Sequence, residues 1–194
     1  MKKYTLIGLM LVFSFCSLAQ ESLVYQQPPE EILELVNATP APSVLIDDKG
    51  EYLILRYRNS YGSIAELSEK EFRLAGLRIN PVTNVSSRKT YFSNLRIKKT
   101  FDDKITDVAG LPETKRLAYF KWSTDQTKIA FTNTTKTGVE LWYLDIKTST
   151  ATKLTDAVLN ANMGAPFVWL KDGSGFLVKF LPENKNTLID VEVA

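Results

Sequence analysis

The chain has 194 residues, with 24 Lys and Arg against 22 Asp and Glu, one cysteine and no histidine. So balanced a charge lacks the field that gathers nucleic acids or anionic membranes, which removes the main driving force for binding either partner. Without histidine the chain cannot contain a Ser-His-Asp triad or a zinc site built from His and Cys. We therefore expect no catalytic residue, no metal and no cofactor.

The first nineteen residues predict an export signal. Lys2 and Lys3 precede an apolar run, residues 4–15, that is too short to span a bilayer as a helix. Small residues then allow a cut between Ala19 and Gln20. We expect residues 1–19 to be removed and the mature chain to be periplasmic or extracellular, without a membrane attachment. An uncleaved membrane anchor is the alternative.

Residues 20–38 predict a leader followed by one short helix. The prolines at the start of residues 28–37 suit a first helical turn, where a missing N–H would have no partner anyway. Glu30 and Glu31 suit the positive end of the helix dipole, so we assign them to the helix end rather than to acid-base chemistry.

From residue 39 to residue 194 the pattern changes to short β-rich runs, and three of them resemble one another. Trp122 lies three residues before Asp125, and the apolar run 129–131 follows. Trp169, Asp172 and the run 176–178 repeat this spacing. A weaker copy centres on Asp48, with Leu45 in place of the tryptophan and 52–54 as the apolar run.

Each copy predicts a β-hairpin whose Asp accepts hydrogen bonds from backbone N–H groups in the turn. The 47 residues from Asp125 to Asp172 match the period of a propeller blade. The longer separation from Asp48 to Asp125 predicts an insertion at about residues 59–100. The fold class is therefore all-β, a partial β-propeller of four-stranded antiparallel blades with a short amino-terminal helix.

Three copies are too few to close a propeller ring, so we expect the outer faces of the end blades to lack a neighbour. The residues expected on those faces are Tyr52, Ile54, Phe176 and Val178.

Several segments resemble a known family. The Trp122–Asp125 turn and the later run 140–145, Glu-Leu-Trp-Tyr-Leu-Asp, resemble blades of TolB-like proteins and of prolyl oligopeptidase and dipeptidyl peptidase relatives. Segments 25–32, 64–68, 74–79 and 84–88 resemble the amino-terminal region of the glutamyl endopeptidase branch of the prolyl oligopeptidase family. The resemblance runs from Tyr25 to Ala194.

That resemblance implies a secreted serine peptidase in which a propeller precedes a carboxy-terminal α/β-hydrolase domain. This chain would be the non-catalytic propeller portion, which gates or binds peptide substrates, including glutamyl peptides, and is inactive alone. A self-contained periplasmic TolB-like binding or scaffold protein is the alternative.

The candidate substrate contacts are basic residues of the insertion. A peptidase that cuts beside glutamate must pair a carboxylate, which arginine does with two parallel hydrogen bonds. Arg78 and Arg88 lie in the runs that match the family, so we assign them to this role, with a solvated surface as the alternative. Asp48, Asp125, Asp172, Trp122 and Trp169 are assigned structural roles at the blade turns.

Overall fold

The structure is a computed structural model and describes residues 26–183. The expected cleavage site between Ala19 and Gln20 lies outside these residues. The chain divides into two compact units, residues 1–38 and residues 39–194. Among residues 26–183 no helix has both the length and the apolar character needed to cross a membrane.

The expected helix of the first unit is α2 (Glu30–Asn37). Glu30 and Glu31 lie in its first turn, as the dipole favours, and no side chain caps its start at Pro29. None of its residues is buried.

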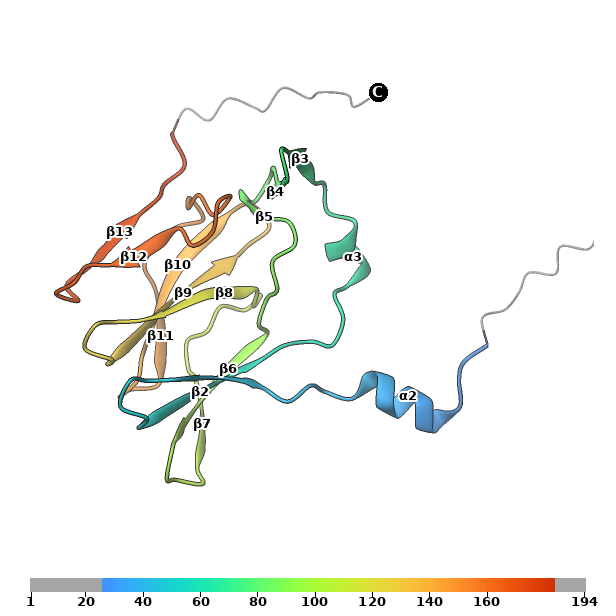
Figure 1. The fold of residues 1–194 in the computed structure, drawn as a ribbon, viewed down its shortest axis with the longest axis horizontal. Helices are drawn as coiled ribbons and strands as arrows, with labels where there is room; N and C mark the ends of the chain where they lie inside the picture. Colours follow the sequence, from blue (N-terminus) through green and yellow to red (C-terminus); the bar gives the residue numbers. More distant parts are fainter. Residues whose placement is uncertain (1–25, 184–194) are drawn as a thin grey trace, which may run out of the picture. The chain divides into compact units, whose positions relative to one another are not determined.

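The second unit is built from antiparallel blades, which confirms the expected all-β fold class (Figure 1). The first blade has the order β1-β2-β6-β7, and the second blade is the consecutive meander β8-β9-β10-β11. A third hairpin pairs β12 with β13. Their bounds are β1 Ser43–Ile46, β2 Tyr52–Tyr57, β6 Asn94–Lys99, β7 Ile105–Asp107, β8 Leu117–Trp122, β9 Lys128–Thr134, β10 Val139–Asp145, β11 Thr150–Lys153, β12 Phe167–Trp169 and β13 Phe176–Val178.

The insertion interrupts the first blade between β2 and β6 and comprises residues 58–93. It contains the short helix α3 (Ile64–Leu67) and the sheet β3-β4-β5, with bounds Phe72–Leu74, Leu77–Asn80 and Val85–Ser86. In Figure 1 it forms an arch that leaves β2, passes through these elements and returns to β6. The expected end near residue 100 was too late, because residues 94–99 pair with β2 as the third blade strand.

The blade turns repeat with one correction to their alignment. Gly50, Gln126 and Gly173 each have positive φ, and each donates its N–H to the carbonyl three residues earlier. These equivalences place Lys49, and not Asp48, at the position of Asp125 and Asp172. Ile46, and not Leu45, is likewise equivalent to Trp122.

The carboxylates of the second and third turns act as expected. Asp125 accepts from Thr127 N at 3.2 Å, and Asp172 accepts from Ser174 N at 3.1 Å. In the first turn Asp47 accepts from Tyr52 N at 2.9 Å. Asp47 is thus equivalent to Ser123, whose Oγ accepts from Lys128 N. In the first turn the carboxylate therefore lies two residues earlier than in the second and third turns.

Two apolar cores lie on opposite faces of the second blade, because successive side chains of a strand point to opposite sides. The first core joins this blade to the first blade and the second joins it to the third hairpin. Residues of the first core include Ile54, Leu95, Ile97, Ile129, Phe131 and Leu144. Residues of the second include Val85, Ala130, Val139, Leu141, Leu159 and Phe167.

The residues expected on unpartnered blade faces lie inside these cores instead. Ile54 is fully buried, Tyr52 packs on the first core, and Phe176 and Val178 pack on the second. The opposite faces of these two sheets are partly open, although Leu55 of β2 is buried there. Their exposed apolar residues are Val44, Ile46, Val168 and Leu177. The end sheets therefore expose apolar side chains, as expected, but the four residues named from the sequence were wrong. Successive side chains of a strand point to opposite faces, and those four point to the buried face.

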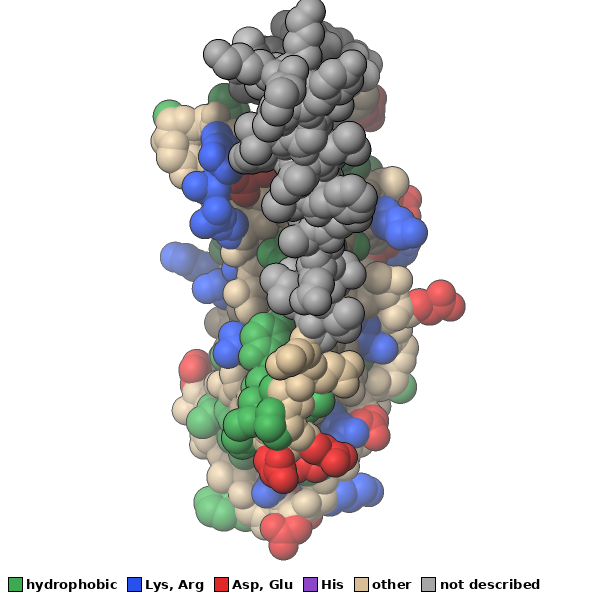
Figure 2. Space-filling view, turned by 90° about the vertical axis from the view of Figure 1, so that its right-hand side faces the viewer, with side chains coloured by type: hydrophobic (Ala, Val, Ile, Leu, Met, Phe, Trp, Pro, Cys, Tyr) green, Lys and Arg blue, Asp and Glu red, His purple; other side chains and the backbone are tan. Residues whose placement is uncertain are grey.

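The charged residues of the chain are mixed on its surface. Figure 2 shows basic and acidic side chains spread over the same face, as expected for nearly equal numbers of each.

Candidate functional site

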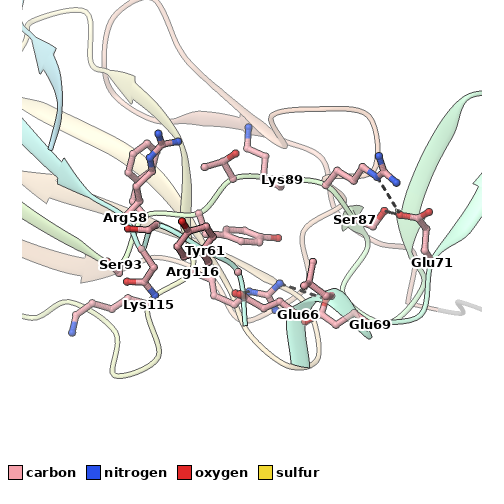
Figure 3. Close-up of a pocket in the computed structure, with 18 of the residues that line it drawn as sticks. Arg58, Tyr61, Glu66, Glu69, Glu71, Ser87, Lys89, Ser93, Lys115 and Arg116 are labelled. Atoms are coloured by element: carbon pink, nitrogen blue, oxygen red, sulfur yellow. Dashed lines mark hydrogen bonds and ion pairs between the residues drawn. The ribbon is translucent and has the colours of Figure 1, made fainter. Parts of the chain in front are cut away.

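A cavity of about 740 Å³ lies between the two ends of the insertion and the residues that precede β8 (Figure 3). This volume falls within the about 300–1,000 Å³ typical of ligand sites. Charged side chains dominate its lining. The basic residues are Arg58, Arg73, Arg88, Lys89, Lys115 and Arg116, and the acidic ones are Glu66, Glu69 and Glu71.

Glu71 is the centre of a polar network on one side of the cavity. Its carboxylate accepts from Ser87 Oγ at 2.6 Å, from Arg78 at 2.6 Å and from Arg73 Nε at 3.1 Å. Arg88 Nε lies 3.9 Å away. These donors, the Ser87 hydroxyl first, lower the pKa of Glu71 from 4.5 to about 2, so the carboxylate is ionised at neutral pH.

A second network fixes α3 to the second blade. Arg116, just before β8, donates to Glu69 at 2.9 Å, and its Nε lies 3.8 Å from Glu66. Glu66 also closes a capping box with Ser63 at the start of α3. The Arg116 guanidinium stands 4.5 Å from the ring centre of Tyr91. The insertion is therefore tied to the blade by charged groups on the cavity wall.

Three basic residues of the lining take part in neither network. Within residues 26–183, Arg58, Lys89 and Lys115 have no carboxylate at ion-pair distance. Lys89 is partly buried, and its Nζ lies 4.0 Å from the ring centre of Tyr119. Burial lowers the pKa of Lys89, since desolvation disfavours the ammonium form.

The two arginines predicted from sequence lie near each other, on either side of Glu71, but they differ in availability. Arg78 makes a 2.6 Å ion pair with Glu71 and does not line the cavity. Arg88 does line it, and its side chain is 68% exposed with only the longer contact to Glu71. Arg88 can therefore meet a ligand, whereas the charge of Arg78 is already paired within the fold.

Sequence reasoning missed Arg58, Lys89 and Lys115 because they are far apart along the chain. Arg58 directly follows β2, Lys89 follows β5 and Lys115 precedes β8. No local signal joins the three, since Arg58 begins the insertion, Lys89 lies within it and Lys115 lies beyond β7. Only the folded arrangement brings these three segments together around the cavity.

The tryptophans of the second and third blade turns contact neighbouring strands and the core. Trp169 Nε1 donates to the Lys121 carbonyl at 3.0 Å, which links the third hairpin to β8. Trp122 packs against the first core. Ser174 lies between Gly173 and Gly175, and its hydroxyl donates a hydrogen bond to Asp172 within the hairpin turn. This serine therefore has a structural role in the turn.

Comparisons with known proteins connect the chain to peptidases. It is 28% identical over 173 residues to a probable chloroplastic glutamyl endopeptidase of Arabidopsis thaliana, and 28% identical over 178 residues to one of Oryza sativa subsp. japonica. These alignments cover 83% and 85% of this chain but 18% and 19% of the plant proteins. The chain thus spans about a fifth of the length of these relatives, and the likeness makes it peptidase-related.

No family model matches the chain. A solved structure described as a 6-phosphogluconolactonase, from Bacteroides fragilis, aligns with 78% of this chain and 49% of its own, at 16% identity and a TM-score of 0.33. So low a score establishes nothing about this chain.

Proposed function

We propose that this chain is the non-catalytic propeller portion of an exported serine peptidase, where it binds and admits peptides to an α/β-hydrolase domain. The observation that carries the proposal is the likeness to two glutamyl endopeptidases along more than four fifths of the chain. The antiparallel blades support it, because such blades form a rigid scaffold whose connecting segments bind ligands.

The chain would contribute binding and orientation rather than bond cleavage. None of its 194 residues is a histidine, so no imidazole can take the proton of a serine nucleophile. The triad would then belong to the hydrolase domain, and this portion would hold the peptide in place. Of the two sequence candidates, Arg88 is the one positioned to contact a substrate glutamate.

The native protein tests this proposal. An antibody raised against residues 39–183 would isolate it from the cells that make it, for measurement of its mass and of labelling by a fluorophosphonate serine probe. We expect one labelled polypeptide longer than this chain. An unlabelled polypeptide no larger than this chain, which is 21.9 kDa before any cleavage, would contradict the proposal and favour the self-contained binding protein.

Export is tested separately by the mass of the mature amino terminus. We propose that residues 1–19 are removed and that Gln20 becomes the first residue. A mature protein that keeps Met1 would support the uncleaved anchor instead.

A further inference from the structure

The cavity beside the insertion carries more positive charge than its own carboxylates neutralise. Six basic and three acidic side chains line it. Glu66 and Glu69 face Arg116, and Glu71 faces Arg73 and Arg88. The excess therefore belongs to Arg58, Lys89 and Lys115. This local excess contrasts with the almost even charge of the whole chain.

Lys89 is the costliest of the three to keep charged, because its ammonium is partly withdrawn from water. Its partner is the ring of Tyr119, whose quadrupole attracts a cation more weakly than a carboxylate does. A β-bulge fixes this ring: Tyr119 has φ of 54°, and the register of β8 with β9 shifts between Ala118 and Lys121. Bulges of this kind re-aim a side chain, and they are common beside functional sites. An anion that enters the cavity would give the Lys89 ammonium the negatively charged partner that the ring does not supply.

The arrangement favours a ligand with several separated negative groups. In Figure 3, Arg58 and Lys115 lie toward one side of the cavity and Glu71 toward the other, with Lys89 between them. The cavity is also lined by Tyr61, Tyr91 and Phe92, which offer apolar surface to a peptide chain. A single small anion would neither span these cations nor use the aromatic surface.

The geometry points to a binding site for acidic peptide segments, in which Arg58, Lys89 and Lys115 pair with carboxylates other than the glutamate proposed to meet Arg88. The inference rests on the proposed function in that it takes peptides as the ligands. It goes beyond it in assigning three further cations of this cavity to the recognition of additional acidic residues.

The test measures binding of a short fluorescein-labelled peptide of alternating Glu and Gly to the full chain, by fluorescence anisotropy at low salt. The same peptide with Gln at every Glu is the neutral probe. We expect the Glu peptide to bind roughly a hundredfold more tightly than the Gln peptide, and each of Arg58→Met, Lys89→Met and Lys115→Met to weaken it roughly tenfold. Methionine keeps an unbranched apolar stem.

The three substitutions are also combined in one variant, whose matched control is the triple variant Lys99→Met, Lys104→Met and Lys147→Met. These lysines line a smaller cavity of about 350 Å³, and removing them changes the net charge by the same amount as removing the three cations. We expect this control to bind the Glu peptide nearly as well as the original chain. Near-ultraviolet circular dichroism checks folding. Should Lys89→Met unfold, Arg58→Met and Lys115→Met carry the test.

Three results would overturn the inference. They are equal binding of the Glu and Gln peptides, an equal loss in the control triple, and tighter binding of a single-stranded oligonucleotide of the same charge that depends on the same three residues. Fluorophosphonate labelling of the native protein is unaffected by any of them, so failure of this site and failure of the proposed function can be told apart.

Discussion

The second blade and the insertion are held together by different forces. The blade buries apolar side chains on both faces, with Ile129, Ala130 and Phe131 all at 0% exposure. The insertion leaves Tyr61, Ile64 and Leu67 between 69% and 86% exposed and is organised by the carboxylates of Glu69 and Glu71. The difference separates a scaffold from a segment that can adapt to a ligand.

The insertion is nevertheless attached to the blade core at one point. Val85 is 1% exposed, belongs to the second core and forms a parallel bridge with Ala161. Ala161 N donates to the Asn84 carbonyl at 2.9 Å. This anchor and the Arg116 ion pairs attach the insertion to the second blade at two places.

Replacing a core aromatic should produce the largest effect. Phe131 stacks between Phe120 and Trp142, with ring centres 5.6 and 6.5 Å away. Phe131→Ala should lower the free energy of unfolding by about 3–5 kcal/mol, because the cavity it leaves cannot be refilled. The measurement is urea denaturation. Ile64→Ala in the insertion is the control and should cost no more than about 0.5 kcal/mol, since Ile64 is 86% exposed.

A Phe131→Ala cost as small as that of Ile64→Ala would remove the distinction between the two regions. It would mean that the first core is loose, and that the stacking of these three rings contributes little to stability.

Substituting a glycine tests whether the second blade is more closely packed than the insertion. A Cβ at Gly138, at the β9–β10 hairpin, would overlap the Ala157 carbonyl oxygen, so backbone must move. Gly138→Ala should destabilise by about 1–3 kcal/mol. Gly62→Ala in the insertion is the matched control, because its Cβ would meet only Glu66 Oε2 at 3.5 Å. Equal melting temperatures for the two variants would contradict the close packing of that hairpin.

Strand periodicity and the repeated turns were enough to predict the blades from sequence. Local signals fix these features: the Trp-to-Asp spacing, the apolar run in residues 129–131 and the period between turns. The same signals misaligned the weakest copy by one residue, since Asp47 and Asp48 both precede Lys49-Gly50 and either could be the turn aspartate. Only the hydrogen bonds decide between them.

The cavity could not be predicted in the same way because its cations come from three segments that are far apart along the chain. Arg78 and Arg88 were identified through a local resemblance, yet the pairing of Arg78 with Glu71 depends on the register of β3 with β4 and on the position of Ser87. Charge alone does not reveal whether an arginine is already paired. That depends on contacts between residues distant in sequence.

The corrected turn alignment predicts a smaller effect on stability, within the first blade. Asp47 is 5% exposed and accepts from Tyr52 N, whereas the Asp48 backbone N–H donates to Gln126 Oε1. Asp47→Ala should cost about 1 kcal/mol, because it leaves the Tyr52 N–H without this acceptor. Asp48→Ala should cost no more than about 0.5 kcal/mol. The reverse order in urea denaturation would restore the sequence alignment.

The smallest effect on global stability, and the most local, should come from acid acting on the insertion. The folded-state pKa of Glu71 is about 2, below its ordinary 4.5, chiefly because the Ser87 hydroxyl donates to the carboxylate. The stabilisation is therefore fully present above about pH 4.5 and is lost as the pH falls through about 2. Hydrogen exchange, corrected for intrinsic rates, should show residues 71–88 losing protection in this window while β9 and β10 keep theirs.

Asp125, whose pKa is also about 2 in a blade turn, is the internal comparison, because its protonation should loosen only residues 123–128. Glu71→Gln should make exchange in residues 71–88 faster already at neutral pH and nearly insensitive to acid. If acid instead opened β9 and β10 together with residues 71–88, the insertion and the blade would form one cooperative unit, and the separation between scaffold and adaptable segment would not hold.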